Sequence, residues 1–125
     1  MIPVKVGGKI VGHIAKYKNR VVYVTYRNPE HFFRKYEGFG ISEAILRKLK
    51  DMNIKFILIL YKDETGVVRH LLSRVDDWFE HGHRYRFLVE RKVHVIVGKT
   101  KPIFYEDFQR VLPIAYMEEV DRETP

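Results

Sequence analysis

Apolar and polar residues alternate in three runs over the first 27 residues, with short turn-like sequences between them. The runs span residues 2–6, 9–17 and 20–27, and the sequences between them are Gly7-Gly8 and Lys18-Asn19. A period of two is typical of β-strands, and two-residue loops join antiparallel strands because glycine and asparagine tolerate positive φ angles. The pattern therefore predicts three antiparallel strands joined by two tight turns.

The third run is apolar on both of its predicted faces. These faces consist of Val22, Val24 and Tyr26 on one side and of Val21, Tyr23 and Thr25 on the other. A strand without a polar face is expected to be covered on both sides or to form an interface. In so short a chain, this feature predicts a homodimer.

A short helix is predicted to follow the third strand. Asn28 can cap free backbone N–H groups, and Pro29 suits the first helical position because its nitrogen carries no hydrogen. The helix is predicted over 29–36, with Gly38 as a left-handed residue beyond its end. Its rings would form one core-facing stripe of Phe32, Phe33 and Tyr36.

A second helix is predicted over 42–52, beginning at Ser42. Together with the helix at 29–36, it has the order of a DNA-binding helix–turn–helix motif. Glu43 argues against that motif, because an acidic residue at the start of a recognition helix would face phosphates. A helical hairpin that packs on a sheet explains the same residues.

The remaining pattern predicts further hairpins and one more helix. Residues 54–61 are almost entirely apolar, as in a strand that is buried on both faces. The other predicted elements are a partner strand at 67–72, a helix begun by the capping sequence Ser73–Asp76 and ended by Gly82, a hairpin of strands 84–89 and 93–97 around Arg91-Lys92, and a short helix within 102–112. Trp78 is predicted to face the core.

These elements indicate an α+β fold in a single domain. We expect an antiparallel β-meander and hairpins, packed with two or three short helices, over residues 1–117. Residues 118–125 are predicted to be an unpacked acidic C-terminal tail. The longest apolar stretch, residues 56–61, is much shorter than a membrane span, and no signal peptide is recognisable, so a cytoplasmic location is predicted.

Charge is distributed unevenly along the chain, which has a formal net charge of +7. Residues 1–62 contain 13 Lys and Arg against 4 Asp and Glu, whereas residues 63–125 contain 10 against 12. Basic protein surfaces attract nucleic-acid phosphates through counterion release. The absence of cysteine and the scarcity of side-chain amides also resemble thermophile proteins, whose surfaces are often rich in lysine.

The charge pattern favours a small, non-catalytic nucleic-acid-binding protein without a cofactor, which contacts mainly the phosphate backbone of DNA or RNA. We expect its cations to gather on one face of the folded chain. The candidate contacts are Lys16, Lys18, Arg20, Arg34, Lys35, Arg47, Lys48, Arg84 and Arg86. Arginines on a β-ribbon suit bidentate contacts with phosphate, although pairing with acidic residues would explain them equally well.

A group of acidic and histidine side chains offers a metal-dependent alternative. Asp77 and His81 are spaced to share one helix face, Asp76 is adjacent, and His83 follows just beyond the helix end. Asp77, His81 and His83 are therefore metal-ligand candidates, and a bound metal could activate water for a nuclease reaction. Alternatively, His81 and Gly82 simply end the helix.

One further sequence feature argues against a nuclease of the restriction-enzyme type. The only E-x-K sequence of the kind found in nucleases, residues 90–92, falls in a predicted turn, whereas such nucleases need it on a strand.

A homo-oligomeric interaction or assembly protein is the third alternative, and it would use exposed rings such as Phe39, Tyr61 and Phe104.

Overall fold

The three N-terminal strands lie where the alternating pattern predicts them in the computed structural model, which describes residues 1–96 and 99–120 and the side chains outside 86–107. β1 (Ile2–Val6), β2 (Lys9–Tyr17) and β3 (Arg20–Arg27) are antiparallel neighbours. Both residues of the Gly7-Gly8 and Lys18-Asn19 turns have positive φ angles, so the two predicted tight turns are confirmed.

These strands belong to a six-stranded mixed sheet. β3 pairs in parallel with β6 (Phe56–Lys62), and β6 pairs with the antiparallel strand β7 (Val68–Arg74). The strand order is β1-β2-β3-β6-β7-β10, where β10 comprises Glu118–Glu119. The strands predicted at 54–61 and 67–72 are therefore confirmed, with boundaries shifted by about two residues.

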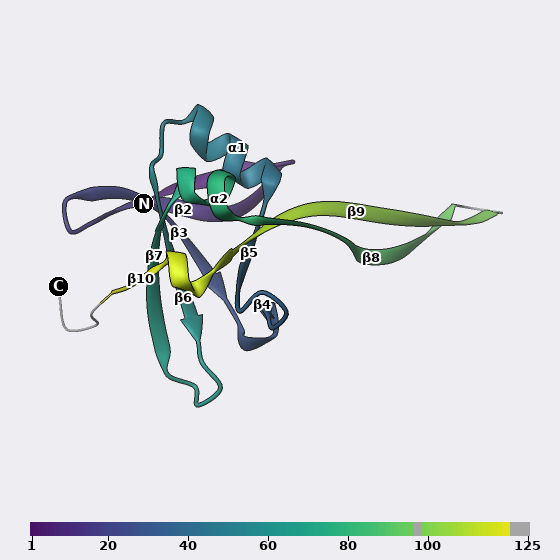
Figure 1. Ribbon diagram of the computed structural model, residues 1–125. Coiled ribbons are helices and arrows are strands. Elements are labelled where there is room, and N and C mark those ends of the chain that lie inside the picture. Colours follow the sequence, from purple (N-terminus) through teal and green to yellow (C-terminus); the bar gives the residue numbers. More distant parts are fainter. Residues whose placement is uncertain (97–98, 121–125) are drawn as a thin grey trace.

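A four-stranded sheet and two helices complete the single α+β domain that the sequence predicts. The sheet has the order β4-β5-β9-β8, formed by β4 (Phe32–Phe33), β5 (Gly38–Ser42), β9 (Lys99–Pro113) and β8 (His83–Ile96). The helices are α1 (Glu43–Asp51) and α2 (Val75–His81), and 3₁₀ turns span Pro29–His31 and Ile114–Tyr116. Figure 1 shows α1 and α2 side by side on one side of the six-stranded sheet. Among the described residues, no helix combines the length and apolar character that a membrane crossing requires.

β8 and β9 form a long two-stranded ribbon that extends away from the body (Figure 1). The hairpin turn predicted at Arg91-Lys92 is wrong, because Arg91 and Lys92 pair with Phe104 and Ile103 inside the ribbon. The helix predicted within 102–112 is also wrong, because these residues belong to β9. Continuous cross-strand pairing accounts for both differences, interrupted only by a register shift between Leu88 and Glu90.

The six-stranded sheet buries apolar side chains on both faces. One face packs against the helices, with Tyr23, Ile57 and Ile59 contributing to the same core as Leu46 of α1 and Trp78 of α2. The opposite face carries a second cluster, formed by Val22, Val24, Leu58, Leu72 and Val120. The prediction that the third strand is covered on both faces is therefore confirmed for its middle.

Burial within one chain weakens the argument for a homodimer that rests on this strand. Its four central residues, 22–25, are all buried without a partner chain. Val21 and Tyr26 remain exposed, at 47% and 67%. The homodimer stays a prediction.

The helix predicted over 29–36 is wrong, and with it both the helix–turn–helix motif and the helical hairpin that would contain it. A 3₁₀ turn leads into the β4–β5 hairpin, in which adjacent rings contact different partners. Phe32 packs edge-to-face on Phe39 and Phe33 on Tyr85, each with ring centroids 5.3 Å apart. Strand geometry separates adjacent side chains in this way, whereas a helix would place both on one stripe. Phe39, predicted to be exposed, is a core residue.

The end predicted for that helix is also different. Glu37 has the positive φ angle, of 49°, whereas Gly38 is an ordinary strand residue. A side chain at Gly38 would collide with the carbonyl oxygen of Leu112 on the neighbouring strand. Gly38 is therefore required for the close approach of β5 and β9.

The predicted helix at 42–52 is confirmed as α1, and the helix that ends before Gly82 is confirmed as α2. Ser73 does not cap α2, contrary to the prediction. Its hydroxyl accepts a hydrogen bond from Trp78 Nε1 at 2.9 Å and donates one to the carbonyl oxygen of Ile57 at 3.4 Å. Ser73 is instead a buried residue of the core.

The chain remains packed beyond residue 117. Glu118 and Glu119 pair with Leu72 and Leu71, and Val120 is buried. The prediction of an unpacked chain is therefore wrong for residues 118–120, because the apolar Val120 anchors them. Residues 121–125 lie outside the described part.

Candidate functional sites

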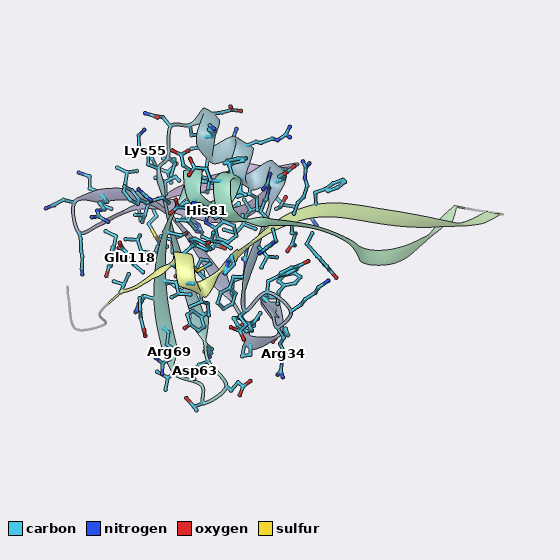
Figure 2. All side chains as sticks on the ribbon, in the orientation of Figure 1. Arg34, Lys55, Asp63, Arg69, His81 and Glu118 are labelled. Atoms are coloured by element: carbon cyan, nitrogen blue, oxygen red, sulfur yellow. The ribbon has the colours of Figure 1, made fainter. Side chains whose placement is uncertain are left out.

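The basic residues predicted to contact nucleic acid occupy three separate places. Lys16, Lys18 and Arg20 surround the β2–β3 turn, and Arg34 and Lys35 lie in the β4–β5 turn. Figure 2 shows Arg34 at the opposite end of the body from Lys55, which precedes β6. The Arg20 guanidinium lies 4.9 Å from the centre of the Phe56 ring, at the same end as Lys55. These two groups therefore lie at opposite ends of the body and do not form one continuous cluster.

The third place brings together residues from α1 and the base of the ribbon. We call Arg47, Arg84 and Arg110, which surround the Glu43 carboxylate, the arginine cluster. Arg84 donates a hydrogen bond to Glu43 Oε2 at 2.6 Å, and Arg110 Nε donates one to Oε1 at 3.2 Å. Arg47 approaches Oε2 at 3.7 Å from the next turn of α1. Three guanidinium groups thus share one carboxylate.

Secondary structure fixes the geometry of this cluster. Glu43 is the first residue of α1, and Arg84 and Arg110 are directly opposite each other on β8 and β9. Arg110 also donates hydrogen bonds to the carbonyl oxygens of Phe79 and Gly82 at the end of α2. Cationic donors at a helix C-terminus satisfy carbonyl groups that lack partners within the helix. Arg110 therefore links both helices to the ribbon.

The cluster retains an excess of positive charge at an exposed surface. Hydrogen bonding from Arg84 holds the pKa of Glu43 below its ordinary value, although burial opposes this shift. The same interaction raises the pKa of Arg84. The side chains of Arg47 and Arg84 are 70% and 53% exposed, whereas that of Glu43 is only 12% exposed. An incoming anion would therefore meet the guanidinium groups before it met the carboxylate.

An aromatic ring lies beside these exposed cations. The Arg84 guanidinium is 5.4 Å from the centre of the Phe108 ring, and Phe108 is 39% exposed. Arg110 and Phe108 are functional candidates that sequence reasoning missed. Arg110 lies opposite Arg84 only because of the register shift between Leu88 and Glu90, which no local pattern in the sequence indicates. The side chain of Arg86, also predicted, lies outside the described residues.

The metal-ligand candidates are only partly brought together. One ligand atom each from Asp77, Glu80 and His81 lies within 4.8 Å of the others. His83 points elsewhere, with its ring stacked on Tyr36 at 4.8 Å. His83 is therefore not part of this group, because residues 81 and 83 lie on either side of the helix end.

The surroundings of this group explain it without a metal. A cavity of about 550 Å³ is lined by Asp77, His81 and Glu118, among others. Both carboxylate oxygens of Asp77 accept hydrogen bonds from Arg74 at 3.2 Å. The His81 ring stacks on Tyr116 at 4.7 Å. A cation could use Asp77 only by displacing the Arg74 guanidinium.

Comparisons of the chain with protein-family models, with curated proteins and with solved structures give no match. Function is therefore inferred from the geometry of the sites.

Proposed function

We propose that this protein binds nucleic acid, without catalysis, through the arginine cluster and the adjoining ribbon. The observation that carries this proposal is the arrangement of three arginines around one nearly buried carboxylate. Guanidinium groups form bidentate hydrogen bonds with phosphate oxygens, and Arg47 and Arg84 are exposed enough to do so. Glu43 and the α2 carbonyl groups hold Arg84 and Arg110 in place, which reduces the entropy lost on binding.

The ribbon extends this basic surface. Residues 83–113 contain seven Lys and Arg against three Asp and Glu. Strands of 14 and 15 residues reach roughly 45 Å at about 3.3 Å per residue, which exceeds one turn of duplex DNA. A two-stranded ribbon is also narrow enough to enter the major groove. The shape and composition of the ribbon therefore support contact with a duplex over several phosphates.

Charge-matched variants test the location of this interface. We expect the double variant R47Q/R84Q to weaken binding of a fluorescently labelled 20-base-pair duplex by about tenfold or more, since each lost phosphate contact removes a charge-assisted hydrogen bond. K16Q/K18Q removes the same charge at the β2–β3 turn and serves as the control. Fluorescence anisotropy at fixed salt measures both. Equal losses in the two variants would contradict the proposed location.

A metal-dependent nuclease is a second candidate, favoured only by the proximity of Asp77, Glu80 and His81. The arrangement is less favourable because Arg74 occupies both oxygens of Asp77. Incubation of the duplex with Mg²⁺, Mn²⁺ or Zn²⁺ tests this candidate directly. We expect no cleavage; cleavage that is lost in both D77A and H81A would favour the nuclease instead.

A further inference from the structure

A second cavity lies beside the last residue of β3, Arg27. Its volume is about 480 Å³, within the range of small-molecule sites. The lining residues are Arg27, Glu30, His31, Phe32, Phe33, Gly40 and Gln109. They come from β3, the following 3₁₀ turn, the β4–β5 hairpin and β9, so the cavity forms where the two sheets meet.

Arg27 presents a positive charge to this cavity without a close counterion. Its guanidinium donates hydrogen bonds to Thr25 Oγ1 at 2.8 Å, to the carbonyl oxygen of Tyr26 at 3.0 Å and to that of Gly40 at 3.3 Å. All three acceptors are neutral. Among the side chains that the structure describes, no carboxylate lies within ion-pair distance of Arg27. Burial lowers the pKa of Arg27, as expected for a cation that lacks a compensating charge.

The walls of the cavity combine aromatic rings with polar groups. The Phe33 ring lies beside Gly40 and provides the aromatic wall, and Gln109 provides a carboxamide with both a donor and an acceptor. Gly40 keeps this region open, because a side chain there would meet Gln109 Oε1 and lie 2.8 Å from the Phe33 ring. His31 Nδ1 accepts a hydrogen bond from the backbone N–H of Asn28, which leaves Nε2 as the protonated nitrogen.

We propose that this cavity binds a nucleotide. The Arg27 guanidinium pairs with the phosphate, the Phe33 ring contacts the base, and the Gln109 carboxamide hydrogen-bonds to the base edge. Arginine suits phosphate, aromatic rings stack on any base, and amide side chains recognise base edges. The nucleotide is either a free nucleoside monophosphate or an unpaired nucleotide within a nucleic-acid strand. The site is separate from the arginine cluster and does not depend on duplex binding.

Glu30 provides a second test, because this acidic residue lies at the same cavity and its negative charge opposes an anionic ligand. We expect E30Q to tighten the binding of AMP, GMP, CMP or UMP by about two- to fivefold, and R27Q to weaken it by about tenfold or more. A misfolded protein would not bind more tightly, so the gain in E30Q is independent of stability. Isothermal titration calorimetry measures these constants, and thermal melting shows whether each variant is folded.

Three further ligands show which part of the nucleotide is recognised and whether it binds as a free molecule or as part of a nucleic-acid strand. Inorganic phosphate and an uncharged nucleoside are each expected to bind at least about tenfold more weakly than the monophosphate, because each lacks one half of the contacts. Displacement of a labelled single-stranded pentanucleotide by the monophosphate would show that strand and free nucleotide share the cavity. Without displacement, the free monophosphate is the ligand.

Different variants separate nucleotide binding in this cavity from duplex binding at the arginine cluster. R47Q/R84Q should leave nucleotide affinity unchanged within about twofold, whereas G40A should weaken it by filling the cavity. The proposal is overturned if wild-type protein binds no monophosphate at millimolar concentration, or if neither E30Q nor R27Q changes the affinity.

Discussion

At the scale of single residues, Glu43 decides the character of the arginine cluster. Its carboxylate is almost buried and accepts hydrogen bonds from Arg84 and Arg110. From the sequence, Glu43 was an argument against a helix–turn–helix motif, because it would face phosphates at the start of the recognition helix. In the structure, this carboxylate is outnumbered by arginines and holds them in position, which the linear order of residues could not reveal. Its hydrogen bonds stabilise the fold and order the arginines, but its negative charge opposes an incoming phosphate, and for binding we expect the effect of the charge to be the larger.

The substitution E43Q separates these two contributions. We expect it to reduce the free energy of unfolding by about 1–3 kcal/mol, because hydrogen bonds to a charged acceptor are lost and guanidinium groups repel one another. The same change should tighten duplex binding severalfold, since the local positive charge rises. Urea denaturation and fluorescence anisotropy measure the two effects. Weaker duplex binding by folded E43Q would contradict this account.

The pH dependence of stability follows from the lowered pKa of Glu43. A carboxyl group whose pKa is lower in the folded state stabilises the fold above its unfolded pKa, and this contribution is lost as pH falls through the folded pKa. The wild type should therefore exceed E43Q in stability at about pH 6, and the difference should shrink below the ordinary value of 4.5. Urea denaturation at a series of pH values measures this difference. A difference that is constant with pH would exclude the proposed role.

At the scale of secondary-structure elements, local sequence predicted the parts whose geometry is local. The turns at Gly7-Gly8 and Lys18-Asn19 need positive φ angles, and their residue types indicate this directly. The ribbon was predicted less well, because Arg91-Lys92 resembles a turn while long-range pairing with β9 continues the strand. Phe32 and Phe33 fit a helix equally well by composition, and only their antiparallel pairing with β5 shows that they form a strand.

The closeness of β5 and β9 gives a prediction at this scale. G38A should destabilise the protein by about 2 kcal/mol or more, because the added methyl group would collide with the Leu112 carbonyl oxygen and force the strands apart. G66A provides a contrast, since Gly66 has open space around it but a positive φ of 83°, so only backbone strain is expected there. Urea denaturation compares the two. A larger loss in G66A would contradict the packing role of Gly38.

At the scale of the whole molecule, the sequence predicted the fold class and the excess of basic charge, but not where that charge gathers. Arg47 and Arg84 were predicted as binding residues and meet in the structure, whereas Arg34 and the cations of the β2–β3 turn lie elsewhere. Their separation depends on how the two sheets pack, which no local pattern encodes. His83 likewise separates from Asp77 and His81 because the chain leaves α2 and enters β8 between them.

The most direct test of the central claim is the salt dependence of binding of the wild-type protein to duplex DNA and to duplex RNA. If the cluster and ribbon neutralise about six phosphates, affinity for duplex DNA should fall roughly a thousandfold between about 50 and 200 mM salt. Fluorescence anisotropy titrations at four or five salt concentrations give this slope. A steep decline is the predicted result for at least one of the duplexes. Affinity that does not change with salt, or no binding of either duplex at the lowest salt, would contradict the proposed function.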